Sequence, residues 1–242
     1  MKVVSINTVC NGSTGKIVGS ISSSLIESGE EAFCIFGRRK GYANIPCKKI
    51  GGFFSFWYHV FLTTVFDLHG HGSYFKTKKI VRELKKLNPD IIHLHNIHGY
   101  YINYKVLFNY LKNTFQGRVF WTLHDCLSMT GHCAYFSNVS CEKWKTECHD
   151  CPNKKMYPTS LLFDRSRKNY QEKKNLFNGV KDLTIITPSV WLQNIVLSSY
   201  LKKYPVKTIN NGIDLNIFYP RLTDSIFDKY NIPKDKKHLG KT

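Results

Sequence analysis

The stretch that decides the fold is residues 2–18, KVVSINTVCNGSTGKIV, where an apolar, β-branched run passes through a glycine-rich turn into a helix-like segment. A P-loop would have glycines five residues apart and a Ser or Thr after its Lys. Here Gly12 and Gly15 are three apart, and Lys16 is followed by Ile17. The dinucleotide-binding pattern G-x-G-x-x-G is not matched either. The stretch therefore predicts only a strand, a tight turn and a helix whose first backbone N–H groups lack helical partners.

Segments like the first one recur along the chain, separated by segments with helical spacing. They are almost continuously apolar, which is typical of strands buried on both faces of a parallel sheet. Between them, Ile17, Ile21 and Leu25 repeat every four residues, as on the buried side of a helix. This alternation predicts βαβ units and a Rossmann-like, doubly wound α/β domain. The expected strands are residues 2–8, 31–37, 90–95, 118–124, 183–189 and 206–210.

The composition is that of a globular and basic protein. The chain has 242 residues, of which 42% are hydrophobic, and this is enough for a sizeable core. With 35 Lys and Arg against 17 Asp and Glu, the formal net charge is +18. Phosphates, nucleic acid and an anionic membrane surface are therefore all candidate partners. The basic blocks at 37–40, 76–86 and 164–174 are also typical of ordinary solvated helix faces.

The N-terminal residues and the most apolar segment bear on where the protein works. The N-terminus lacks the apolar core of a signal peptide, so we expect a cytoplasmic protein whose eight cysteines are thiols or metal ligands. Residues 53–66, FFSFWYHVFLTTVF, are fewer than the roughly 18 that a membrane-spanning helix needs. They predict a helix that either packs in the core or lies peripherally on a membrane surface.

Polar and titratable residues follow several of the predicted strands. In a doubly wound sheet, ligands bind in the crevice at the carboxyl ends of the strands. Two of the strands end in histidine-rich turns, at residues 93–96 (HLHN) and 122–125 (TLHD). One histidine at a strand end is as often structural as functional, but two such turns favour a functional cleft at this edge.

Half of the cysteines fall within 19 residues and have the spacing C-x7-C-x6-C-x2-C. Four thiolates that include a C-x-x-C pair can hold a structural zinc ion, which would leave no open position for catalysis. His132 or His149 could replace one thiolate, and four reduced thiols in a loop are the simpler alternative. The predicted zinc ligands are Cys133, Cys141, Cys148 and Cys151.

Several segments, spread over most of the chain, together resemble the N-terminal half of the family 4 retaining glycosyltransferases of bacterial exopolysaccharide and lipopolysaccharide synthesis, including colanic-acid-like pathways. The resemblance implies a GT-B fold, in which an N-terminal acceptor-binding domain faces a C-terminal domain that binds the nucleotide sugar. The segments are residues 89–103 (PDIIHLHNIHGYYIN), 122–136 (TLHDCLSMTGHCAYF), the cysteine run to Pro152, 187–192 (TPSVWL) and 210–220 (NNGIDLNIFYP).

The resemblance also implies roles for particular residues. His124 matches the family's cleft histidine, which lies beside the transferred sugar, and Asp125 follows it, so both are candidate catalytic residues. The turn after the first strand matches the loop that faces the donor diphosphate, and the turn at residues 95–100 is where acceptor contacts are expected. The donor-facing residues are Gly12, Ser13, Thr14 and Gly15. The acceptor-binding residues are His95, Asn96, His98 and Tyr100.

These expectations divide the chain into a Rossmann-like acceptor-binding domain, residues 1–212, with a cysteine-rich insertion at 133–151, and a hinge with a lead-in to a donor-binding domain, residues 213–242. The family's Glu-x7-Glu donor motif does not occur after the hinge. We therefore expect a truncated form with little transfer activity alone, or one that needs a complementary C-terminal domain on a separate chain.

The sequence also leads to expectations about ligands and to one alternative function. The resemblance implies a nucleotide-sugar donor, a saccharide or lipid-linked saccharide acceptor, and no catalytic metal. A zinc-clipped, basic nucleic-acid-binding protein is the alternative function. It is disfavoured because the basic residues are dispersed and no recognition helix adjoins the cysteines.

Overall fold

The computed structural model describes residues 1–219, 228–231 and 233. The chain divides into two compact units, Met1–Asn211 and Gly212–Thr242. The predicted lead-in at residues 213–242 lies largely outside the described residues. In the part of it that is described, the Asp214 carboxylate accepts a hydrogen bond from the Asn216 amide at 2.9 Å.

The first unit is built on a seven-stranded, entirely parallel sheet with the strand order β3-β2-β1-β4-β5-β6-β7. This order reverses between β1 and β4, which is where ligands bind in doubly wound folds. The predicted fold class is confirmed. The strands are β1 (Lys2–Val9), β2 (Glu31–Arg38), β3 (Cys47–Lys49), β4 (Ile91–Leu94), β5 (Arg118–Thr122), β6 (Leu183–Thr187) and β7 (Val206–Thr208).

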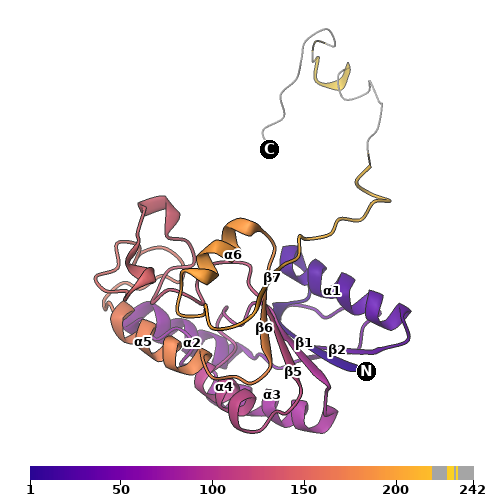
Figure 1. Ribbon diagram of the computed structural model, residues 1–242, viewed down its shortest axis with the longest axis horizontal. Helices are drawn as coiled ribbons and strands as arrows, with labels where there is room; N and C mark the ends of the chain where they lie inside the picture. The colour runs from indigo at the N-terminus through magenta and orange to yellow at the C-terminus, as the bar shows by residue number, and fades with distance from the viewer. Residues whose placement is uncertain (220–227, 232, 234–242) are drawn as a thin grey trace. The chain divides into compact units, whose positions relative to one another are not determined.

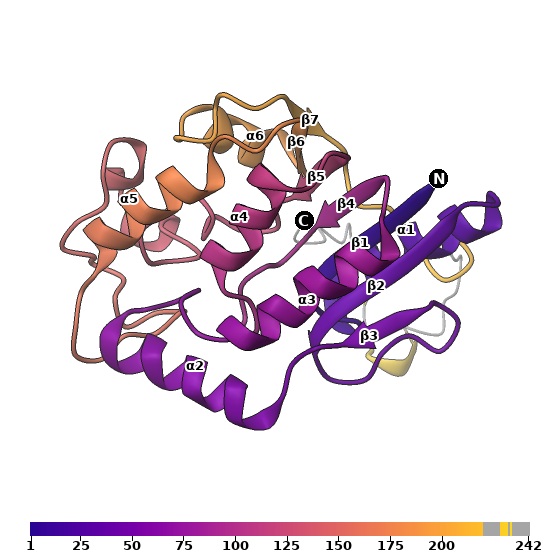
Figure 2. The same cartoon turned by 90° about the horizontal axis from the view of Figure 1, so that it is seen from below.

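Helices cover both faces of the sheet (Figures 1 and 2). One face carries α1, and the other carries α3, α4 and α5, with α2 on the outer side of this layer. The cysteine-rich insertion lies in the connection between β5 and α5. Among the described residues, no helix is both long and apolar enough to cross a membrane. The helices are α1 (Gly12–Glu27), α2 (Phe53–Phe66), α3 (Tyr74–Leu87), α4 (Tyr104–Asn113), α5 (Ser166–Phe177) and α6 (Val190–Leu197).

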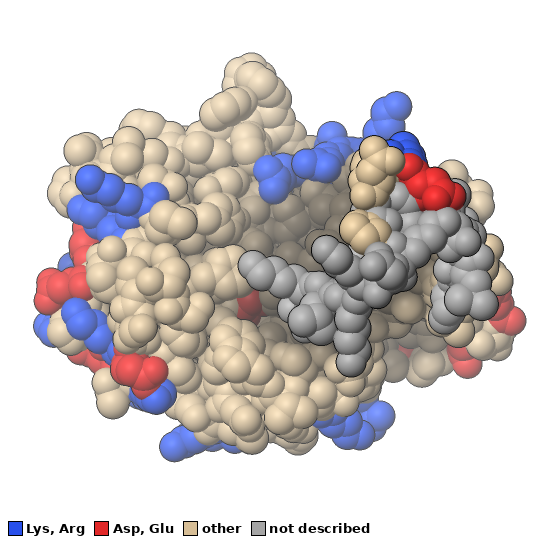
Figure 3. All heavy atoms as spheres, turned by 90° about the horizontal axis from the view of Figure 1, so that it is seen from above, with Lys and Arg blue, Asp and Glu red and all other residues tan. Residues whose placement is uncertain are grey.

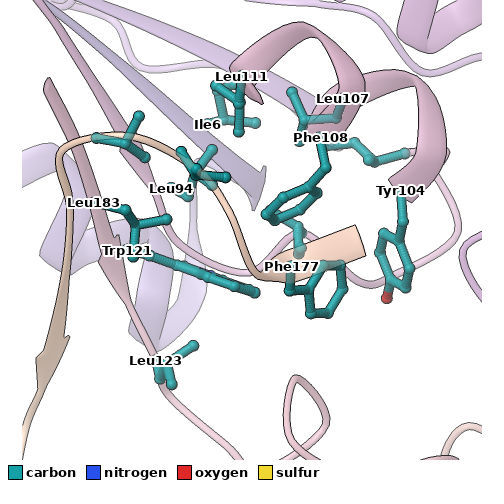
Figure 4. Close-up of a cluster of buried hydrophobic side chains, with 14 of the residues drawn as sticks. Ile6, Leu94, Tyr104, Leu107, Phe108, Leu111, Trp121, Leu123, Phe177 and Leu183 are labelled. Carbon is teal, nitrogen blue, oxygen red and sulfur yellow. The ribbon is translucent and has the colours of Figure 1, made fainter. Parts of the chain in front are cut away.

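The core lies between the sheet and the layer of α4 and α5, and its centre is aromatic (Figure 4). The indole of Trp121 on β5 packs edge-on against Phe177 at 5.2 Å between ring centroids, and Phe108 lies 4.5 Å from Phe177. All three side chains are buried. The Trp121 indole N–H also donates to the carbonyl of His95 at 3.3 Å, so the core holds the turn after β4 in place.

Candidate functional site

The turns that follow β4 and β5 lie side by side because these strands are neighbours in the sheet. Leu94, the last residue of β4, pairs with Trp121 of β5. The segments that follow β4 and β5 therefore leave the sheet at the same edge, with residues 95–100 opposite residues 123–126. The sequence-based expectation that two histidine-rich turns meet at this edge agrees with the geometry.

A pair of histidines forms the deeper part of the site. Nδ1 of His95 lies 3.2 Å from Nε2 of His124, and the two rings are stacked with their planes 16° apart. His95 is only 1% exposed, and burial, aided by the charges of His93 and His124, places its pKa well below the ordinary value. Burial also lowers the pKa of His124. Both imidazoles are therefore neutral at neutral pH and can donate and accept hydrogen bonds.

His98 and Asp125 form the second contact between the turns. Nε2 of His98 lies 2.7 Å from Oδ2 of Asp125, while Oδ1 of Asp125 accepts the Leu127 amide at 2.9 Å. Burial alone would raise the pKa of Asp125, but the charge and hydrogen bond of His98 and the Leu127 amide lower it below its ordinary value. Nδ1 of His98 in turn lies 3.0 Å from the Tyr157 hydroxyl. The site thus holds an ionised carboxylate beside two neutral imidazoles.

The glycine-rich turn begins α1 and is tied to the same site through Asn7. The Asn7 side chain is fully buried; its oxygen accepts the amide of Asn96 at 3.2 Å, and its amide lies 3.4 Å from the Thr14 hydroxyl. Asn11 is the N-cap of α1 but makes no capping hydrogen bond with its side chain. The first N–H groups of α1 are therefore available to an anion, as at other helix N-termini.

Gly15 is required by close contact, because a Cβ atom there would lie 2.5 Å from the carbonyl carbon of Cys10. We expect Gly15→Ala to lower the free energy of unfolding by about 1–3 kcal/mol, since the obstacle is backbone that must move. Urea unfolding measures this. The exposed Ser13→Ala in the same turn is the matched control and should change stability by less than about 0.5 kcal/mol. Equal stability of the two variants would contradict the contact.

Tyr100 lies in the turn after β4 but belongs to an aromatic group at its side. Its backbone is in the left-handed region, with φ of 68°. Its ring packs against His69 at 5.6 Å and Tyr157 at 6.2 Å. Of the predicted acceptor residues, His95, Asn96 and His98 therefore contact the two turns and β1 directly, whereas Tyr100 forms a flank.

Four residues that shape the site had no role assigned from the sequence. Asn7 and Thr8 are polar residues near the end of an otherwise apolar strand, and that signal could have found them. The Thr8 hydroxyl lies 2.9 Å from the carbonyl of Asn96. Arg38 ends β2, and its guanidinium lies 5.2 Å from the ring of Phe56. Tyr157 comes from the loop before α5, and nothing in its local sequence indicates that it reaches His98.

The predicted zinc ligands are gathered but are not arranged as ligands. All four cysteines line one small pocket together with His132 and His149. The sulfur of Cys148 accepts the Gly131 amide at 3.2 Å. Among the described residues, no three His, Cys, Asp or Glu side chains are placed to hold a metal ion. Zinc at Cys133, Cys141, Cys148 and Cys151 therefore stays a prediction and has no part in the chemistry below.

Other surface features lie away from these turns. A cavity of about 590 Å³ between α5 and the segment after α6 is lined by lysines such as Lys174 and Lys202, and by no residue of the two turns. On the face shown in Figure 3, the visible Lys and Arg side chains are scattered along the margins and do not gather in one patch.

A parallel doubly wound sheet with a ligand edge at the β1–β4 reversal defines a Rossmann-like domain, and solved structures place it more closely. Sucrose-phosphate synthase from Thermosynechococcus elongatus superposes with a TM-score of 0.57 at 14% identity over 97% of this chain and 53% of its own. UGT71G1 of Medicago truncatula, solved with UDP-glucose, gives 0.50 at 11% identity over 95% and 56%. The fold is that of the N-terminal half of a GT-B glycosyltransferase.

Sequence comparison points to the same class. The putative colanic acid biosynthesis glycosyl transferase WcaC of Escherichia coli K12 is 33% identical over 133 residues, which cover 52% of this chain and 32% of that protein. No protein-family model matches the chain. In sequence and in fold the chain is therefore similar to part of these glycosyltransferases, and it spans about half or less of the length of the proteins it matches.

Proposed function

We propose that this chain is the acceptor-binding half of a retaining glycosyltransferase of the family 4 type. The reaction would move a sugar from a nucleotide-sugar donor to a saccharide acceptor. The observation that carries the proposal is the paired contact of the two turns, His95 with His124 and His98 with Asp125, beside the uncapped start of α1.

The chemistry of these groups suits sugar transfer. The ionised carboxylate of Asp125 and the neutral imidazole of His124 can hold sugar hydroxyl groups and stabilise an oxocarbenium-like centre by hydrogen bonding and charge. The start of α1 carries the equivalent of about half a positive charge, which favours a departing diphosphate there. A donor-binding domain, on this chain or a separate one, would deliver the nucleotide sugar to this side.

A lipid-linked saccharide of bacterial surface polysaccharide synthesis is the acceptor that we propose. The similarity to a putative colanic acid biosynthesis transferase supports this choice, although it covers only part of each chain. Such an acceptor would be used at the inner face of the cell membrane.

Saccharide binding at Asp125 tests the proposed function. We expect oligosaccharides released from a colanic-acid-type polysaccharide to shift the NMR signals of His95 and His124. In Asp125→Asn the affinity should fall by roughly 10- to 100-fold, because a hydrogen bond to a charged group is worth about 1.5–3 kcal/mol. Asp150→Asn is the matched control: Asp150 is exposed, pairs with the neighbouring His149, and has a left-handed backbone that Asn also tolerates.

Two results would contradict this function. One is that no saccharide in the panel shifts the two histidine signals. The other is that Asp125→Asn and Asp150→Asn bind saccharide equally well. Melting curves of both variants must show that each remains folded.

A further inference from the structure

The helix α2 buries polar residues and exposes aromatic ones, which is the reverse of an ordinary surface helix. Its buried side carries the polar residues His59 and Thr63, which are 1% and 0% exposed. Surface helices normally bury their apolar side and expose polar residues. The exposed side of α2 is instead aromatic: Phe53 is 72% exposed, Phe54 87%, Trp57 53%, Tyr58 59% and Phe61 52%.

One other segment extends this apolar surface. The loop before α5 runs along the end of α2, where the Leu161 amide donates to the Thr64 carbonyl at 2.8 Å and the Phe163 ring stacks on Phe66 at 5.6 Å. We call the combined surface the aromatic face. It consists of Phe53, Phe54, Trp57, Tyr58, Phe61, Leu161, Leu162 and Phe163, all more than half exposed. Contiguous apolar patches of this kind mark interaction sites.

Positive charge borders the aromatic face. No residue of α2 is charged. At its start, Nζ of Lys76 lies beside Gly52, 3.2 Å from where a Cβ atom would be. At the other border, Nζ of Lys154 donates to the Leu162 carbonyl at 3.4 Å.

One acid, Asp164, follows Phe163 directly at this border. Its two carboxylate oxygens already accept backbone amides, from Cys151 at 2.6 Å and from Ser166 at 2.8 Å. A helix with Trp, Tyr and Phe side chains outward and lysines at its borders is suited to binding an anionic bilayer. In such a complex, aromatic rings lie at the level of the lipid headgroups and lysines contact acidic lipids.

The aromatic face also adjoins the candidate site. Two residues of α2, Phe56 and His59, pack against Tyr100 at 5.7 Å and 5.8 Å between ring centroids. Tyr100 lies in the turn after β4 that carries His98. A bilayer bound to the outer side of α2 would therefore lie one helix away from this turn.

We propose that the aromatic face docks the domain on an anionic lipid bilayer. The lipid-linked acceptor would then reach the turn after β4 from the membrane surface, and this last step alone rests on the proposed function. The helix lies in the interface plane, with its rings among the headgroups and its bordering lysines on acidic lipids.

Vesicle flotation tests the docking, and it requires no transferase activity. The chain should float with vesicles of 70% phosphatidylcholine and 30% phosphatidylglycerol and bind pure phosphatidylcholine at least tenfold more weakly. The double variant Phe54→Ser, Trp57→Ser should lose at least tenfold in binding to the anionic vesicles. Trp191→Ser is the matched control, because Trp191 is 56% exposed on α6, outside the aromatic face. Each of Lys76→Gln and Lys154→Gln should weaken binding about fivefold.

Three outcomes would overturn the proposal: no flotation with anionic vesicles, equal binding to neutral and anionic vesicles, or a dimer in solution that Phe54→Ser, Trp57→Ser makes monomeric. The last would assign the face to a second copy of this chain. A failure of the proposed function can be told apart from a failure of the docking proposal, because vesicle binding without saccharide binding would contradict only the proposed function.

Discussion

Replacing Asp67 with Ala should lower the free energy of unfolding by about 3–5 kcal/mol, because the change breaks a buried ionic network. Asp67 is the C-cap of α2 and is fully buried. Its carboxylate accepts from Nδ1 of His132 at 2.6 Å and from the Arg165 amide at 2.8 Å, and its carbonyl accepts from the Asn169 side chain at 2.7 Å. One residue therefore joins α2 to the cysteine-rich insertion and to α5.

The expected loss of stability is large because the same carboxylate also stabilises the charge of a buried lysine. Lys173 is 4% exposed and donates to the carbonyls of Leu127 and Thr130 at 2.9 Å and 3.0 Å. Burial lowers the pKa of Lys173 to about 8, and the charge of Asp67 acts against that shift. Without Asp67, the ammonium of Lys173 and the imidazole of His132 are buried with less compensation.

Urea unfolding of three variants separates the contributions at Asp67. Asp67→Asn removes the charge, and Asn tolerates the left-handed backbone of this position. Most of the decrease in the free energy of unfolding seen in Asp67→Ala should therefore remain in Asp67→Asn. Glu142→Ala removes an exposed acid that pairs with Lys145, and it should cost less than about 1 kcal/mol. If Asp67→Asn were as stable as the parent chain, the ionic network would not contribute to stability.

Most of the sheet could be predicted from the sequence, and the exception has a physical reason. Strands buried on both faces, such as β1 and β5, need apolar residues at nearly every position, so their sequences show where they lie. The edge strand β3 is the segment Cys47–Lys49, and its two lysines are exposed. A short strand with a solvated side leaves no apolar run to recognise.

The candidate site was predictable where it follows strand ends and not where it depends on long-range contacts. His95 and His124 could be brought together because parallel strands end at one edge. The contact between Tyr157 and His98 joins residues 59 positions apart through an irregular loop. The sequence also could not predict that α2 buries its polar side and exposes its aromatic side, since an apolar helix of this length suits a core as well as a surface.

Lowering the pH from 7 to 5 should destabilise the domain strongly, because four histidines are buried as neutral groups. Burial lowers the pKa of His59 to about 3 and that of His93 to about 4, and it places the pKa values of His69 and His95 well below the ordinary value. His59 shows why: its Nε2 accepts the Gly70 amide at 3.0 Å, and its Nδ1 contacts the Ser73 hydroxyl. A proton on Nε2 would face another N–H group.

The direction of the effect follows from proton binding in the two states. Above about pH 6.5 these histidines are neutral whether the chain is folded or unfolded, and they add no pH dependence. Below it, the unfolded chain takes up protons that the folded chain refuses, so stability falls by about 1.4 kcal/mol per pH unit for each histidine. His132 acts oppositely, because Asp67 outweighs burial and raises its pKa, so its contribution is present at low pH and lost as the pH rises.

Because the contribution of His132 is constant below about pH 6.5, the four buried histidines together should lower the unfolding free energy by up to about 5.6 kcal/mol per pH unit between pH 6.5 and 4. A domain of typical stability, about 5–15 kcal/mol, would then unfold within one to three pH units of neutrality. Urea unfolding at half-unit intervals from pH 7.5 to 5 measures the slope. His59→Asn should make the slope shallower by the equivalent of one proton. A stability that stays constant from pH 7 to 5 would show that the buried histidines accept protons in the folded state, and the neutral imidazole pair assigned to the site would then be wrong.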